Sequence, residues 1–225
     1  MNFKNSTETI LSFDKLFWIF LAGSFLGVIV EGLYSVWVNG YWESHVVTVW
    51  GWFNLLYGIG ALGFYYGAAK LKDRSLAMQV FIMTAIATIV ELVCGILLKH
   101  VLGMRAWNYS TRFMNIDGFI CPAFSLAWGF MALIFSLSFR RISHILDKIE
   151  HPRIHIAAVV LSIVLGLNYC FASAAIVRWS DRHYGFRPET RLGSYLDRSM
   201  NDEWMSSRFM DWYFVDELEE SASQE

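Results

Sequence analysis

The chain has 225 residues, of which 56% are hydrophobic and 17% aromatic, and its formal net charge is −2. Charged residues make up 17%, below the roughly 25% of a typical soluble domain, and they fall in short clusters between long apolar stretches. This composition excludes an ordinary soluble globular protein. The chain has no strongly basic face, so we expect no nucleic-acid partner.

Five apolar stretches are long enough to cross a bilayer, which takes about 20 mostly apolar residues. In chain order they are 16–37, 50–69, 76–99, 119–139 and 154–179. They predict an all-α integral membrane protein with about five transmembrane helices in residues 1–179, followed by an amphipathic, acidic tail in 180–225. The first stretch exceeds the apolar core of a signal peptide, about 7–15 residues, and no cleavage motif follows it. We therefore expect it to remain as a membrane span.

Lysine and arginine positions predict the orientation, because cytoplasmic loops are enriched in these residues. Nine basic residues flank the ends that this rule places inside: Lys4, Lys15, Lys70, Lys72, Arg74, Arg140, Arg141, Lys148 and Arg153. Three lie at the opposite ends: Lys99, Arg105 and Arg112. The N-terminus is therefore predicted inside and the C-terminus outside, although arginines in the tail add positive charge to the outer side.

Two glutamates, Glu31 and Glu91, interrupt the first and third apolar stretches, each within the string Ile-Val-Glu. A carboxylate in hydrocarbon costs at least about 2–3 kcal/mol, so such residues face a bundle interior or a wet cavity and are candidates for a functional site. Each is the sixteenth residue of its span, about 22 Å from the inner edge. On two parallel helices the carboxylates could meet, and Gly23 with Gly27 would let backbones approach closely.

The chain resembles a duplicated helical hairpin followed by a fifth helix. After each glutamate comes a loop of glycine and aromatic residues (39–42 and 103–109), then an apolar stretch that opens with Gly51 or Gly118. Repeats of this kind occur in transporters, with sites at the repeat interface. Chance alignment of apolar residues is the alternative explanation.

The loop between the third and fourth stretches holds the densest polar cluster near the membrane. It could complete a substrate-binding site with the glutamates, and an arginine of this loop could pair with one of them. The candidate site comprises Glu31, Glu91, Asn54, Tyr57, Arg105, Trp107, Asn108, Tyr109, Arg112, Asn115, Asp117 and Ser125. Alternatively, Trp107 and Tyr109 form an interfacial belt, while Asn115, Asp117 and Gly118 cap the fourth helix, with Pro122 in its first turn.

The tail contains a predicted helix start at residues 201–203, followed by a stretch rich in aromatic residues and methionine. We expect this stretch to lie on the membrane surface or against the loops, and residues 216–225 to be disordered. The chain has no P-loop, HExxH or GxSxG motif, and its three cysteines lack metal-ligand spacing. No metal, cofactor or catalytic residue is therefore assigned.

These motifs resemble the bacterial family of putative ABC-transporter type IV permeases. The resemblance covers most of the chain and rests on these segments: Gly27 to Glu31, 56–61, Glu91, 107–110, 115–121, 125–129, 195–197 and 201–205. The family usually has Trp-Asp-Tyr and Asn-Gly where this chain has Trp107-Asn108-Tyr109 and Asp117-Gly118. The resemblance implies a multi-pass permease of the bacterial inner membrane.

Three functions remain open. The first is a permease whose outward-facing site binds a small or lipid-like solute. Because the chain has no P-loop, a separate ATP-binding subunit would then dock on the cytoplasmic loops 70–74 and 140–153. The second is an intramembrane enzyme with the glutamates as general acid and base, which we expect less. The third is an assembly or sensory subunit. Membrane lipid is an expected partner, and a homo-oligomer is compatible with the sequence.

Overall fold

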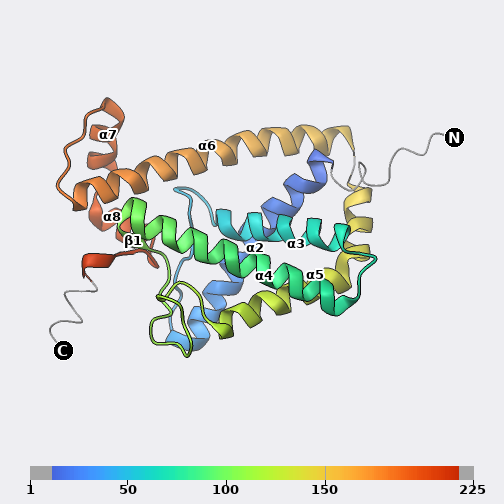
Figure 1. The fold of residues 1–225 in the computed structure, drawn as a ribbon. Coiled ribbons are helices and arrows are strands. Elements are labelled where there is room, and N and C mark those ends of the chain that lie inside the picture. Colours follow the sequence, from blue (N-terminus) through green and yellow to red (C-terminus); the bar gives the residue numbers. More distant parts are fainter. Residues whose placement is uncertain (1–11, 150, 218–225) are drawn as a thin grey trace.

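The computed structural model describes residues 12–149 and 151–217, which form a mostly helical bundle (Figure 1). The long helices are α2 (Phe13–Asn39), α3 (Leu55–Lys70), α4 (Leu76–Leu97), α5 (Pro122–Lys148) and α6 (Pro152–His183). A π-helical turn, η1 (Leu98–Leu102), extends α4. Two short helices, α7 (Arg191–Ser199) and α8 (Asp202–Arg208), follow α6. Strands β1 (Met104–Arg105) and β2 (Tyr213–Phe214) pair antiparallel.

The predicted fold class is confirmed: the chain is all-helical apart from the β1–β2 pair, and its apolar helices match a multi-pass membrane protein. Among the described residues, four helices are long and apolar enough to span a membrane: α2, α4 with η1, α5 and α6. Helix α3 has 16 residues, about 24 Å of helix, which is shorter than a hydrocarbon core of about 30 Å. It begins at Leu55 rather than at Trp50, because the Asn54 side chain accepts a hydrogen bond from the Leu56 N–H and caps the helix.

The two predicted helical hairpins are the two most extensive helix pairs, α2 with α3 and α4 with α5. Gly23 and Gly27 lie at the contact between α2 and α3. A Cβ at Gly23 would stand 2.4 Å from the Ala61 Cβ, and one at Gly27 would stand 2.3 Å from the Tyr57 ring. We expected these glycines to bring the first and third spans together. They instead bring α2 against the helix that follows it, because the hairpin partner covers that face.

Residues 40–54, here called the re-entrant segment, turn back into the bundle before α3 begins. The Asn54 N–H donates to the carbonyl of Ser24, near the middle of α2, at 3.1 Å. The Asn168 side chain, midway along α6, accepts from the Trp50 N–H at 3.2 Å and donates to the Trp50 carbonyl at 2.7 Å. Helix α3 therefore starts about halfway along the bundle, and non-helical backbone occupies the remaining length.

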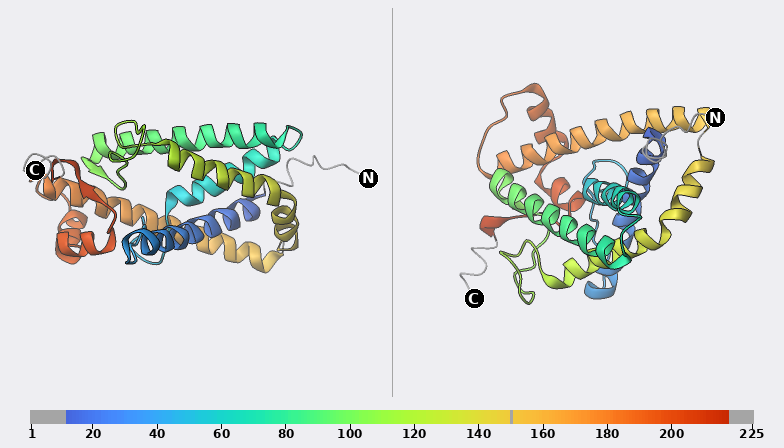
Figure 2. Two further views of the ribbon diagram at one scale, coloured as in Figure 1. Left: turned by 90° about the horizontal axis from the view of Figure 1, so that it is seen from below. Right: turned by 45° about the vertical axis from the view of Figure 1, so that its right-hand side comes forward.

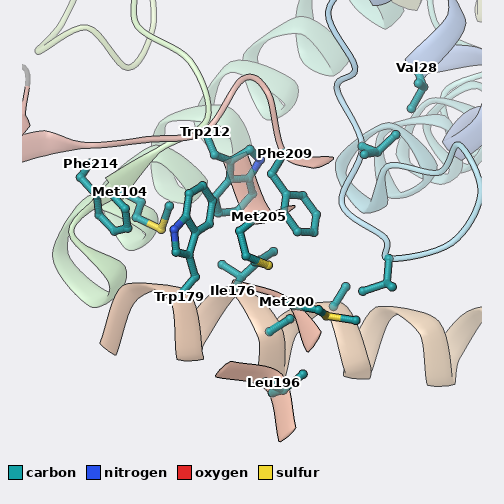
Figure 3. Packing of buried hydrophobic residues seen from close by; sticks show 14 residues of the cluster. Val28, Met104, Ile176, Trp179, Leu196, Met200, Met205, Phe209, Trp212 and Phe214 are labelled. Atoms are coloured by element: carbon teal, nitrogen blue, oxygen red, sulfur yellow. The ribbon is translucent and has the colours of Figure 1, made fainter. Parts of the chain in front are cut away.

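The loop between α4 and α5 and the C-terminal helices gather at one end of the bundle, opposite the start of α2 (Figures 1 and 2). Their side chains share one buried apolar cluster with α6 and the re-entrant segment. Figure 3 shows Trp179, Met205 and Trp212 gathered beside α6. The predicted helix start is confirmed, since Asn201 caps α8 by accepting from the Trp204 N–H at 3.0 Å. The stretch after it packs against the loops, and most of 216–225 lies outside the described residues.

Polar contacts fasten the opposite end of the bundle. Lys15 of α2 pairs with Asp147 of α5 at 2.5 Å. The adjacent Asp14 contacts His155 of α6 at 2.8 Å. The start of α2 is therefore tied to both later helices at the end predicted to lie inside.

The α2–α3 contact predicts a position-specific cost of adding one methyl group. Gly27→Ala places a Cβ against the Cβ and ring of Tyr57, which cannot move without shifting α3. We expect a loss of about 1–3 kcal/mol of stability, seen as a lower melting temperature in detergent. The matched control is Gly60→Ala on α3, where the space is open and higher helix propensity favours alanine. Equal melting temperatures for both variants would contradict this close packing.

Candidate functional site

Glu91 of α4 is buried, with 4% exposure, and both of its carboxylate oxygens accept hydrogen bonds. The Tyr109 hydroxyl donates to Oε1 at 3.1 Å, and the Trp128 indole N–H donates to Oε2 at 2.9 Å. Helical side chains lean toward the N-terminus, so Trp128 of α5 and Glu91 of the antiparallel α4 reach toward each other. Nearby, Thr88 donates to Ser125 at 3.1 Å and aligns the two helices.

Tyr109 is held in place by its loop and by aromatic stacking. Its backbone N–H donates to the Gly118 carbonyl at 2.8 Å. Its ring stacks on Phe124 at 4.3 Å, and Phe124 meets Tyr34 of α2 edge-on at 6.2 Å. Burial, with smaller contributions from the charges of Glu91 and Glu31, raises the pKa of Tyr109 above its usual value. The hydroxyl therefore keeps its proton and remains a donor to Glu91.

Glu31 of α2 lies in the same region but is held differently. It is half-buried, and its charge acts on Tyr109 together with that of Glu91. The charged groups around it are His45, Asp211, Glu91 and Glu43. Within residues 12–149 and 151–217, Glu31 makes no hydrogen bond or ion pair. The site therefore combines one carboxylate fixed by two neutral donors with a second whose oxygens are uncommitted.

His45 of the re-entrant segment lies among acidic groups. Its Nδ1 stands 3.2 Å from Asp211 Oδ2, and its Nε2 stands 3.8 Å from Glu43 Oε2. Burial alone would lower the pKa of His45, but the hydrogen bond to Asp211 and the charges of Glu31, Asp211 and Glu43 outweigh burial and raise it above 6.5. Burial raises the pKa of Asp211, whose Oδ1 is buried with no partner in the described chain.

Some of the predicted residues meet around the glutamates. Tyr109 contacts Glu91 directly, and Ser125 contacts its neighbour Thr88. Asn54 donates to the His45 carbonyl at 2.8 Å, and Tyr57 packs on Gly27 one turn before Glu31. Trp107 supports the loop by donating from its indole N–H to the Phe119 carbonyl at 2.8 Å.

The arginine partner expected for a glutamate is absent from the described residues. Arg105 donates to the Asp117 carbonyl at 2.9 Å and lies over the Phe119 ring, 4.5 Å from its centroid. Its Nη2 is 3.9 Å from the Asp117 carboxylate, which also pairs with Lys99. Arg112 is exposed and forms no ion pair in the described part of the chain. Arg105 is thus engaged by Asp117 and Phe119 and contacts neither glutamate.

The expected cap on the fourth helix is also corrected. Helix α5 begins at Pro122 with Cys121 as its N-cap, and no side chain caps it. Asn115 instead closes the preceding turn, where its Oδ1 accepts from the Gly118 N–H at 3.0 Å. Asn108 accepts from the Ser110 N–H at 2.9 Å, so both asparagines shape the loop.

Sequence reasoning missed Trp128, His45 and Asp211. A signal for Trp128 existed: Ser125 and Trp128 share the three-residue spacing of Thr88 and Glu91, which suits facing helices. His45 and Asp211 are 166 residues apart, and no local pattern connects them. No cluster of three or more His, Cys, Asp or Glu side chains able to hold a metal ion occurs in the described residues.

The fold and the site define a polytopic helical membrane protein with an acidic centre inside the bundle. The chain belongs to the family described as "Putative ABC-transporter type IV", whose model matches residues 18–173. This membership confirms the resemblance drawn from the motifs. Neither a curated protein nor a solved structure matches the chain. The matched region contains both glutamates and His45, whereas Asp211 lies beyond it.

The two hydrogen bonds to Glu91 predict that the stability of the fold depends on each of the two donors. Tyr109→Phe and Trp128→Phe each leave a buried carboxylate oxygen without its hydrogen bond, so we expect each to cost about 1–3 kcal/mol of stability. Adding Glu91→Gln to Trp128→Phe should recover part of the loss, because a neutral amide tolerates burial better. Thermal unfolding in detergent measures both effects. Tyr41→Phe, at an exposed position, is the control and should leave stability unchanged. Losses no larger than that of the control would refute the arrangement.

Proposed function

We propose that this chain is the membrane-spanning permease subunit of a transporter, with the region around Glu31 and Glu91 as its solute-contacting site. The observation that carries the proposal is the unequal pair of carboxylates. Glu91 is fixed by Tyr109 and Trp128, whereas Glu31 shares its surroundings without a bonded partner among the described residues. Ligand sites use a small number of placed polar groups to orient a ligand, and Glu31 is free to serve as such a group.

The re-entrant segment, which replaces the first part of the predicted second span, supports the same proposal. Transporters commonly place sites near the membrane midplane where helices are discontinuous. Non-helical backbone at that depth is tolerated only where protein buries it or a cavity hydrates it. Here the re-entrant segment is bound by Asn168 and by the Ser24 carbonyl, and it brings His45 beside Glu31. Family membership adds a transporter-like assignment.

The energy source in this proposal is a separate ATP-binding subunit, since the chain has no P-loop. Its docking surface would be the end of the bundle opposite the site. We place this end on the cytoplasmic side of a bacterial inner membrane. Basic residues at that end are exposed, including Lys72, Arg74, Arg140 and Arg141. They form two groups, one after α3 and one along the last turns of α5.

An intramembrane enzyme is the second candidate, and one observation favours it. An uncommitted carboxylate, Glu31, lies in the electrostatic field of both His45 and Glu91, and such groups can exchange a proton with a substrate. Product formation by the purified chain alone, without an ATP-binding subunit, would favour this alternative over transport.

Solute exchange by whole cells tests the proposal even though the substrate is unidentified. Cells lacking the chain are complemented with wild type, Glu31→Gln, Glu91→Gln or the double variant, and depletion of solutes from a defined medium is followed by mass spectrometry. We expect at least one solute whose uptake or release falls about tenfold or more in Glu31→Gln, as befits loss of a charged contact.

Glu189→Gln is the matched control, because this glutamate is exposed in the loop after α6 and should leave exchange unchanged. Membrane levels of each variant are measured in parallel. A folded double variant with wild-type exchange of every solute would overturn the permease site and would favour an assembly or sensory role.

A further inference from the structure

The re-entrant segment is bound by a part of the chain far away in sequence. We call residues 201–217 the C-terminal segment. Arg208 of this segment donates from Nε to the Thr48 carbonyl at 2.9 Å and from Nη2 to the Gly51 carbonyl. Three residues later, Asp211 contacts His45. These contacts hold the C-terminal segment against the segment that lies beside Glu31.

The contact between His45 and Asp211 depends on charge. The charged groups that act on His45 are all acidic: Glu43 of its own segment, Glu31 of α2 and Asp211 of the C-terminal segment. Arg208 of the C-terminal segment binds backbone carbonyls, and Arg105 of β1 binds the Asp117 carbonyl. A protonated His45 is thus the counter-charge that the described residues provide for this group of carboxylates.

We propose that His45 and Asp211 form a proton-dependent latch, which locks the C-terminal segment onto the re-entrant segment when His45 is protonated and releases it when His45 is neutral. Loss of the proton to water leaves Glu31, Glu43 and Asp211 facing one another without a cation. A buried charge that loses its partner is strongly destabilising, and Asp211 is the most buried member of the group, with an 8% exposed side chain.

The direction of the pH effect follows from the raised pKa of His45. A histidine whose pKa is higher in the folded than in the unfolded chain stabilises the fold fully below the unfolded value of 6.5. That stabilisation is lost as pH rises through the folded value. The latch is therefore closed below pH 6.5 and opens as pH rises through the raised pKa of His45.

Apolar packing limits how far the segment can move. Phe209 and Trp212 are buried in the cluster shared with Trp179, and these contacts do not depend on pH. The latch therefore sets how frequently the segment opens locally, and the segment remains attached in both states. The latch goes beyond the proposed function, because it involves a residue, Asp211, outside the family match.

Hydrogen–deuterium exchange of the full chain in lipid nanodiscs tests the latch independently of transport. Protection of peptides covering residues 205–214 is measured between pH 6 and pH 9, after correction for the intrinsic exchange rate. We expect wild-type protection to fall about tenfold or more across this range. His45→Gln should show low protection that is nearly constant with pH. Asp211→Asn should move the midpoint to lower pH, because His45 then loses its principal partner.

His183→Gln is the matched control. His183 also touches the C-terminal segment, stacking on Phe214 at 3.6 Å and contacting Asp216 at 2.9 Å, yet it lies outside the cluster around Glu31. This variant should keep the wild-type pH dependence. Persistence of that dependence in His45→Gln, or its loss in His183→Gln alone, would overturn the latch. Solute exchange is scored separately, so failure of the permease proposal leaves this result unaffected.

Discussion

The need to satisfy backbone polar groups inside a membrane governs this structure. Residues 40–54 are non-helical, so they do not satisfy their own N–H and C=O groups as a helix does. Side chains from distant parts of the chain bind these groups instead. Asn168 binds both backbone groups of Trp50, and Arg208 binds the carbonyls of Thr48 and Gly51. The irregular backbone beside Glu31 therefore depends on α6 and the C-terminal segment, which bind its polar groups.

The same constraint distinguishes the two glutamates. Glu91 lies in the α4–α5 hairpin, where Trp128 of the facing helix and Tyr109 of the connecting loop satisfy its carboxylate. Glu31 lies where its own hairpin is interrupted, and its neighbours are the groups of the re-entrant segment and the C-terminal segment. The same string, Ile-Val-Glu, therefore has two chemical settings, because a helix and its loop supply donors to Glu91 whereas the re-entrant segment and the C-terminal segment surround Glu31.

Composition and the lengths of the apolar runs were sufficient to predict the class of fold, because long apolar runs have few alternatives to membrane helices. The internal repeat predicted the hairpin pairs, and the resemblance of the motifs indicated the family. The start of α8 was also predictable, since Asn201 carries a local capping signal. The length of α3 was not, because Trp50 and Phe53 are apolar and only tertiary contacts keep them out of a helix. The acidic neighbours of His45 escaped prediction for a related reason: Asp211 reaches it through the folding of the tail.

The position at which α3 begins also shapes the electrostatics of the bundle. A helix N-terminus carries roughly half a positive elementary charge, and the N-terminus of α3 meets α2 at Ser24. Glu31 is seven residues further along α2, about 10 Å of helix rise. In a low-dielectric interior this partial charge acts over such a distance. The peptide dipoles of α3 thus offset part of the negative potential around the carboxylates, in addition to the charge of a protonated His45.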